Sequence, residues 1–223
     1  MSRQTSRNEQ RQKTFVRCDL VATDYEIRQR TKLVDDLSEQ FSCIPETSFC
    51  TDGEFIRVCQ HRIDKKPWPN PHERETKEAF LRLADELDRI SPRIVHGDLS
   101  KKNLLFDGKS FCIIDWEPCL RQKRKGKITL LYTEPYLALE DRRNDRLTQN
   151  TDKLTYLFSA YRGLHGHFPF SNGRKLVLDR INKEVPLVPL DETELSLMSF
   201  VELTYFAFRK KDSILEQLLR YRF

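Results

Sequence analysis

Apolar residues recur at every third or fourth position in several stretches of the chain, which is the spacing of one face of an α-helix. Residues 75–90 are the clearest case, with an apolar face made of Phe80, Leu83, Ala84, Leu87 and Ile90. The same spacing predicts further helices over 24–41, 151–165, 191–208 and 213–223. Asp24 stands where the first of these helices would begin, and we expect it to cap that helix.

Shorter apolar runs predict strands. Residues 14–22 have the composition of a strand, and two further runs flank Thr51-Asp52-Gly53, which is typical of a hairpin turn. A second hairpin is predicted around Asp107-Gly108. The segment 64–73 contains three prolines within five residues and is predicted to be a linker.

These elements predict an α+β protein with a small mixed front part and a larger, mainly helical back part. We expect a polar, basic and flexible N-terminus over 1–13, a front part over 14–63 and a back part over 74–223, joined by the linker. With 223 residues, of which 38% are hydrophobic, the chain is long enough to bury a core.

Charge and cysteine content narrow the classes of function only a little. The net charge of +5 is compatible with nucleotide or phosphorylated partners but does not demand nucleic acid. The basic run 121–127 is predicted to be a solvated loop, with an anionic surface or acidic substrate as the alternative; no aromatic residues are interleaved with it, so nucleic-acid binding is disfavoured. The six cysteines form no C-x-x-C pair, which favours reduced, buried thiols over disulfides or a zinc site.

Targeting signals are not evident from the sequence. The N-terminal residues lack the apolar core of a signal peptide, and no run approaches the length of a membrane helix. We therefore expect a cytoplasmic protein, and the sequence leaves export by a route without a signal peptide open.

The candidate chemistry lies between 94 and 118. Asp98 follows His96-Gly97, Asn103 comes five positions later, and Asp115 follows the predicted Asp107-Gly108 hairpin. Phosphoryl transfer from ATP needs a carboxylate that orients the attacking hydroxyl and accepts its proton, together with oxygen ligands for Mg²⁺. Because Mg²⁺ takes few protein oxygens, Asn103 and Asp115 would suffice as its ligands, with Asp98 as the base.

This arrangement resembles the protein-kinase-like superfamily. The His-Gly-Asp form is that of aminoglycoside phosphotransferases, choline kinases and the RIO and Bud32 atypical kinases, and Asp115 resembles the metal ligand of the Asp-Phe-Gly motif. The resemblance implies a two-lobed fold with a reduced N-terminal β lobe and a mainly helical C-terminal lobe. It also implies ATP and Mg²⁺ as cofactors.

The resemblance extends downstream of Asp115. Residues 132–141 resemble the end of a protein-kinase activation segment, with Glu140 as its closing glutamate and Leu139 where proline is usual. Asp152 resembles the aspartate that braces the catalytic loop. These features imply a protein Ser/Thr acceptor rather than a small molecule.

The front part departs from the superfamily pattern. Gly53 is the only glycine before Gly97, so no glycine-rich phosphate-covering loop can be assigned. Arg17 stands in the position of the strand lysine that contacts nucleotide phosphates, with Lys13 as the alternative, and Glu26 is the predicted ion-pair partner. Ser100 replaces the lysine usual in protein kinases, as in the small-molecule kinases, and the adjacent Lys101 is a further candidate for nucleotide contact.

Three hypotheses follow from this set. The first is an ATP- and Mg²⁺-dependent kinase acting on a hydroxyl acceptor, with a protein preferred over a sugar or lipopolysaccharide-type acceptor. The second is a pseudokinase or interaction module without turnover. The third, nucleic-acid binding, is the weakest. Comparison with bacterial effector kinases adds the expectation of an activator protein.

Overall fold

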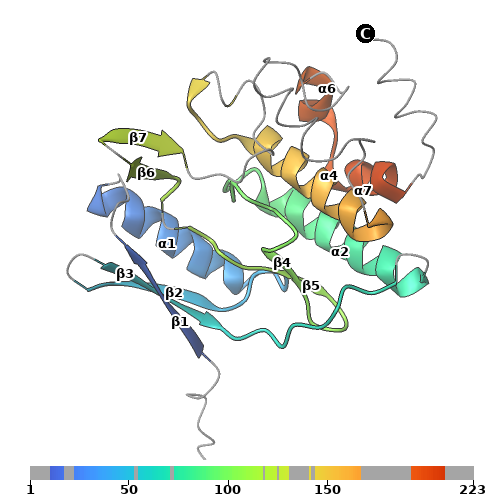
Figure 1. The fold of residues 1–223 in the computed structure, drawn as a ribbon, viewed down its shortest axis with the longest axis horizontal. Helices are drawn as coiled ribbons and strands as arrows, with labels where there is room; N and C mark the ends of the chain where they lie inside the picture. The colour runs from blue at the N-terminus through green and yellow to red at the C-terminus, as the bar shows by residue number, and fades with distance from the viewer. Residues whose placement is uncertain are drawn as a thin grey trace, which may run out of the picture.

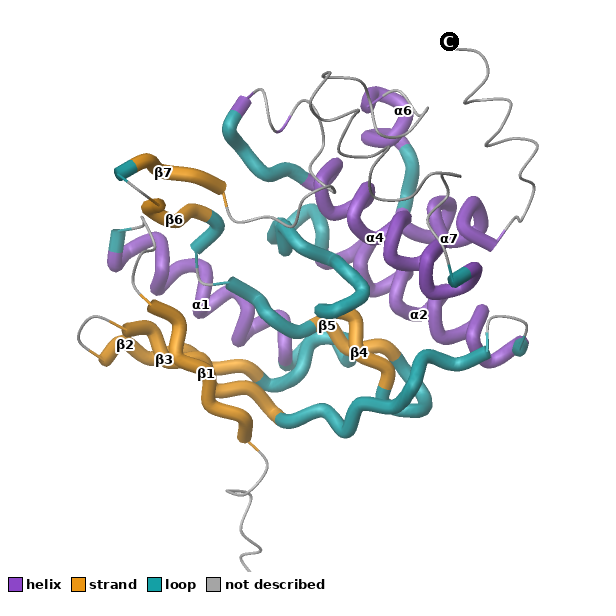
Figure 2. Tube along the Cα trace, viewed as in Figure 1, coloured by secondary structure: helices purple, strands orange, loops and turns teal. Residues whose placement is uncertain are grey.

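The computed structural model describes residues 11–17, 23–52, 55–70, 73–117, 119–124, 126–130, 141, 144–166 and 192–208. A three-stranded antiparallel sheet with helix α1 across it forms one part, and a group of packed helices forms the other (Figure 1). The loops that precede β4 and follow β5 run between these two parts (Figure 2). The α+β, two-lobed architecture predicted from the sequence is confirmed.

The sheet has the strand order β1-β3-β2. Its strands are β1 (Arg11–Arg17), β2 (Thr47–Asp52) and β3 (Phe55–His61). The hairpin predicted around Gly53 is therefore confirmed, and β1 pairs with β3 so that Arg17 lies opposite Phe55. Strand β1 begins three residues before the predicted start at residue 14, and residues 18–22 of that prediction lie outside the described part of the chain.

Helix α1 spans Asp24–Ser38, and its cap differs from the prediction. Thr23, not Asp24, is the N-cap: its Oγ accepts from the backbone N–H of Glu26, and the Glu26 carboxylate accepts from the N–H of Thr23 at 2.8 Å. This capping box satisfies two amides of the first turn that would otherwise lack partners. The helix ends before Phe41, which is nevertheless 8% exposed and belongs to the core.

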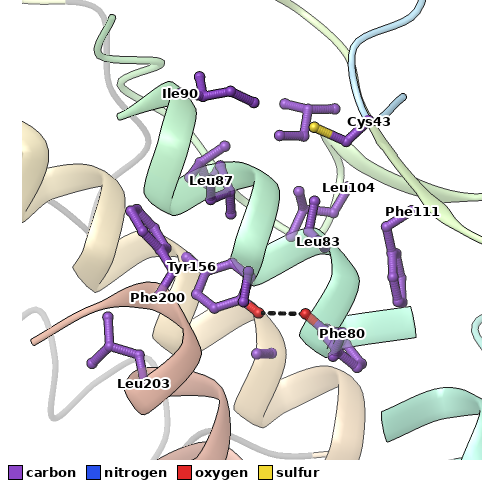
Figure 3. Close-up of a cluster of buried hydrophobic side chains, with 14 of the residues drawn as sticks. Cys43, Phe80, Leu83, Leu87, Ile90, Leu104, Phe111, Tyr156, Phe200 and Leu203 are labelled. Atoms are coloured by element: carbon purple, nitrogen blue, oxygen red, sulfur yellow. Dashed lines mark hydrogen bonds between the residues drawn. The ribbon is translucent and has the colours of Figure 1, made fainter. Parts of the chain in front are cut away.

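The helical part is built on α2 (Arg74–Ile90) and α4 (Gln149–His165), with α7 (Phe200–Phe208) packed against both. The predicted apolar face of α2 is buried, and it meets aromatic residues of the other two helices (Figure 3). Within this core the Tyr156 hydroxyl bonds the Thr204 hydroxyl at 2.6 Å. Burial raises the pKa of Tyr156. The buried hydroxyl therefore remains protonated and satisfied.

The single helix predicted over 191–208 is two helices, α6 (Glu192–Leu197) and α7. Ser199 separates them, because its Oγ accepts from the N–H of Glu202 while the Glu202 carboxylate accepts from the N–H of Ser199. The Asp88 carboxylate on α2 accepts from the N–H of Phe200 at 2.7 Å. These bonds satisfy the amides of a helix start, so a new helix begins there. The helix predicted over 213–223 lies outside the described residues.

Two short hairpins complete the described fold. The first, β4 (Leu104–Phe106) with β5 (Phe111–Ile113), confirms the predicted Asp107-Gly108 turn, where Gly108 has φ +106°. The second, β6 (Arg121–Arg124) with β7 (Lys127–Leu130), replaces the predicted basic loop. Its turn contains Gly126 at φ +77°, and Leu130 is buried against Leu147, so the segment is anchored rather than fully solvated.

The linker is attached to the helical part by Trp68. Its indole N–H donates to the backbone oxygen of Leu104 at 3.1 Å, and its ring packs edge-on against Phe80 and Phe111. The ring also lies against α4 at Gly163, where a Cβ would stand 1.8 Å from a Trp68 ring carbon. Gly163 is therefore required by close approach of a side chain, not by its backbone conformation.

Gly163→Ala should lower the free energy of unfolding by about 1–3 kcal/mol, because the added methyl group overpacks against the Trp68 ring. The measurement is denaturant unfolding of the single variant and of the same substitution in a Trp68→Ala background. With the ring removed, Gly163→Ala should cost nothing and gain helix propensity. An equal cost in both backgrounds would show that the Trp68 contact is not the reason for glycine.

Candidate active site

The loop that carries Asp98 is held in place by hydrogen bonds to Asp152 of α4. The Asp152 carboxylate accepts from the backbone N–H groups of His96 and Gly97, each at 2.7 Å. Burial raises the pKa of Asp152 to about 7, while these two bonds and the nearby Arg30 cation oppose the rise. The bracing role predicted for Asp152 therefore has a geometric basis in two N–H groups that converge on one buried carboxylate.

His96 joins this loop to the segment after β5. Its Nδ1 accepts from the N–H of Asp98 at 3.2 Å, so its Nε2 carries the proton and donates to the backbone oxygen of Ile114 at 3.0 Å. The ring is 2% exposed and packs edge-on against Trp116. Burial lowers the pKa of His96 to about 3. The ring is neutral near neutral pH, which supports the structural role favoured from the sequence over proton transfer.

Asp98 and Asn103 are joined directly. The Asn103 amide Nδ2 donates to the backbone oxygen of Asp98 at 2.9 Å and to its carboxylate at 3.2 Å. Asn103 is buried, and its own backbone oxygen accepts from the N–H of Ile114 at 2.9 Å. The five-residue spacing between Asp98 and Asn103 thus closes a compact loop that also touches the segment leading to Asp115.

Asp115 follows β5 in a left-handed backbone conformation, with φ +67°. That conformation is unusual for a residue other than glycine and is favoured at functional turns. Desolvation of the carboxylate, followed by the nearby charge of Asp98, raises the pKa of Asp115. Asp98 and Asp115 are therefore close enough to repel each other, and a cation between them would relieve that repulsion.

Two further residues of the site were not identified from the sequence. Glu117 lies two positions after Asp115, and burial, followed by the charge of Asp115, raises its pKa to about 7. Arg30 of α1 donates from Nε to the backbone oxygen of Glu117 at 2.5 Å and from Nη2 to that of Val95 at 2.8 Å. Arg30 follows Ile27 by three positions and precedes Val34 by four, so it lies on the apolar face of the predicted helix, and this inward position was the signal that the sequence offered.

The predicted nucleotide contacts of the front part stay predictions. Lys13 and Arg17 both lie on β1, opposite Cys59 and Phe55 of β3, and their side chains are outside the described part of the structure. The exposed Glu26 carboxylate is engaged in the cap of α1, and hydrogen bonds from Thr23 lower its pKa.

Lys101 is placed beside the linker. Its ammonium lies 4.6 Å from the centre of the Trp68 ring, a cation–π geometry, and partial burial lowers its pKa. A nucleotide contact by Lys101 also remains a prediction. The segment 132–140, with Leu139 and Glu140, lies outside the described residues.

The donor set fits Mg²⁺ better than a transition metal. Within the described ranges, no three His, Cys, Asp or Glu side chains gather where they could hold a metal ion. What the site offers is the two mutually repelling carboxylates of Asp98 and Asp115 and the amide of Asn103. Mg²⁺ is commonly held by one or two protein oxygens together with phosphate oxygens, so this sparse oxygen set is sufficient.

Comparison with known proteins also points to a phosphotransferase with a kinase-like fold. The model of the phosphotransferase enzyme family APH matches residues 54–121, which include Asp98, Asn103 and Asp115 but less than half of the chain. Among solved structures, the kinase PK-1 of Cydia pomonella granulovirus matches with a TM-score of 0.54 over 86% of each chain, at 15% identity. No curated protein matches the sequence.

These findings confirm the protein-kinase-like fold predicted from the sequence. The likeness to the viral kinase is structural, because the identity is low, while the match to the phosphotransferase model falls on the candidate site itself. Together they support a phosphotransferase. In the part of the chain that the structure describes, no helix has the length and apolar character needed to cross a membrane.

Acid should destabilise the protein through His96. The unfolded ring takes up a proton near pH 6.5 and the folded ring only near pH 3, so the stability that His96 contributes is lost as pH falls between these values. At pH 5 the loss should be about 2 kcal/mol relative to pH 8. Asp152 and Glu117 have raised pKa values, so their protonation stabilises the folded protein as pH falls. The destabilisation due to His96 must therefore be isolated by substituting that residue.

The measurement is the free energy of unfolding of wild type and His96→Asn at pH 8 and pH 5. His96→Asn should be less stable at pH 8 but lose less on acidification. His61→Asn, at an exposed position, should follow wild type. Equal acid sensitivity of His96→Asn and wild type would contradict a buried neutral imidazole.

Proposed function

We propose that this protein is an ATP- and Mg²⁺-dependent phosphotransferase that moves the γ-phosphoryl group to a hydroxyl acceptor. The observation that carries the proposal is the backbone-locked arrangement of Asp98, Asn103 and Asp115. The His96 ring and the Asn103 carbonyl both bond Ile114, so the loops that carry the two aspartates have a fixed spacing.

In this proposal Asp98 orients the acceptor hydroxyl and accepts its proton. The Asn103 amide holds the Asp98 carboxylate and so limits its rotation, which keeps it in the orientation that proton transfer requires. Mg²⁺ held by Asn103 and Asp115 would supply the positive charge that neutralises the phosphates during transfer. Phosphate contact is assigned to Arg17 or Lys13, with Glu26 and Lys101 as secondary candidates.

For the acceptor we propose a protein Ser or Thr hydroxyl, on the resemblance of residues 132–141 to an activation segment. A small-molecule hydroxyl is a second candidate, because the matched family model is that of the APH phosphotransferases and Ser100 stands where protein kinases carry lysine. We retain the expectations of a cytoplasmic protein and of an activator partner as part of this proposal.

The test is transfer of label from γ-labelled ATP with Mg²⁺, to a protein mixture in one arm and to sugar and aminoglycoside acceptors in another. Asp98→Asn and Asp115→Asn should each lower transfer by roughly 100-fold or more, because each removes a charge that acts in the transition state. Asp85→Asn, an exposed carboxylate on α2 paired with Arg89, is the matched control and should be active.

The outcomes distinguish a protein kinase, a small-molecule kinase and a non-catalytic interaction module. Label in a protein arm supports the Ser/Thr proposal, and label only in the small-molecule arm supports the second candidate. Unchanged transfer in both active-site variants would show that the phosphotransferase site is elsewhere. Absence of transfer by the wild type with every acceptor, with and without cell extract as a source of activator, would favour the interaction module.

A further inference from the structure

Arg30 is a partly buried cation that none of the proposed steps uses. It lies in the middle of α1, and burial lowers the pKa of its guanidinium although the Asp152 and Glu117 carboxylates oppose this. Placing a charge in the interior is costly unless its donors are satisfied and opposite charges are near. The guanidinium of Arg30 must therefore be stabilised by the groups that it contacts.

Those groups are two backbone carbonyls on two different loops. Nε donates to Glu117, two residues after Asp115, and Nη2 donates to Val95, three residues before Asp98. A planar guanidinium holds its donors in a fixed fork, so two acceptors bound by one arginine are held at a defined separation. The Arg30 side chain of α1 thus connects the residue that begins the Asp98 loop, Val95, with the residue that follows the Asp115 segment, Glu117.

The electrostatic surroundings favour a cation at this position. The positive charge of Arg30 opposes the rise in the pKa of both Asp152 and Glu117. It therefore partly balances the negative charge of these two carboxylates beside the candidate site. A neutral side chain of similar length would leave two partly buried carbonyls without these donors and would leave the nearby carboxylates without a balancing charge. Both effects act on the loops rather than on the apolar core.

We propose that Arg30 is a positioning residue for phosphoryl transfer, coupling α1 to the relative placement of Asp98 and Asp115. The inference rests on the proposed function. Loss of the two Arg30 bonds would then let the loop before Asp98 and the segment after Asp115 shift relative to each other.

The first arm of the test measures steady-state transfer by Arg30→Lys and Arg30→Met, at a temperature where unfolding curves show every variant to be fully folded. Arg28→Met, at an exposed position on the same helix, is the matched control. Both Arg30 variants should lose roughly 10- to 100-fold in kcat with little change in the KM for acceptor, because misplaced loops weaken catalysis more than binding. Arg30→Lys should recover part of the loss, since it restores the charge and one donor.

The second arm does not depend on activity. Amide hydrogen exchange should accelerate in both Arg30 variants but not in Arg28→Met at His96 and Gly97, whose N–H groups bond Asp152, and at Ile114, whose N–H bonds Asn103. Exchange in α2 and α4 should remain at the wild-type rate.

The two arms separate this inference from the proposed function. Faster loop exchange in the Arg30 variants, found together with a wild type that transfers no phosphate, would support the coupling and contradict the phosphotransferase. Normal kcat in both Arg30 variants, or a lower kcat with loop exchange unchanged, would overturn the positioning role. A lower unfolding midpoint with unchanged kcat would assign Arg30 to stability alone.

Discussion

The buried carboxylate of Asp152 is the contact on which the candidate site depends. It receives two backbone N–H groups from the residues just before Asp98, and it does so from the first turn of a helix most of whose residues are buried. A charged acceptor placed between two amides fixes both amides in direction, and the loop that follows inherits that direction. From there His96 and Asn103 transmit the constraint to Ile114, and so to Asp115.

This chain of bonds explains why the helical part carries so much of the site. Helices α2, α4 and α7 bury the largest share of the apolar side chains, and the loops with Asp98 and Asp115 extend directly from that core. Asp152 is 3% exposed, so the closely packed core around it leaves the two loop amides as the main hydrogen-bond donors to its carboxylate. Arg30 adds a second attachment, from α1, and it links the site to the smaller part of the fold.

The sequence predicted the elements whose patterns are local. The apolar face of α2, the Asp107-Gly108 hairpin and the spacing of Asp98, Asn103 and Asp115 all follow from residues close together in the chain. The prediction missed the cap at Thr23 and the break at Ser199, although each is a local capping pattern in which a Ser or Thr is followed three positions later by Glu. The inward position of Arg30 could have been read from its place between Ile27 and Val34, but its acceptors could not, since those carbonyls lie 65 and 87 residues away.

The front part of the site decides whether this fold acts as a kinase, because no glycine-rich loop can be assigned in the sequence. Calorimetric titration of the protein with ATP, with and without Mg²⁺, tests this most directly. The account predicts saturable binding that requires Mg²⁺ and is weakened by Asp115→Asn, since Asp115 is a proposed ligand of the ion. Absence of binding in the presence of Mg²⁺, or binding indifferent to both the ion and Asp115, would contradict it.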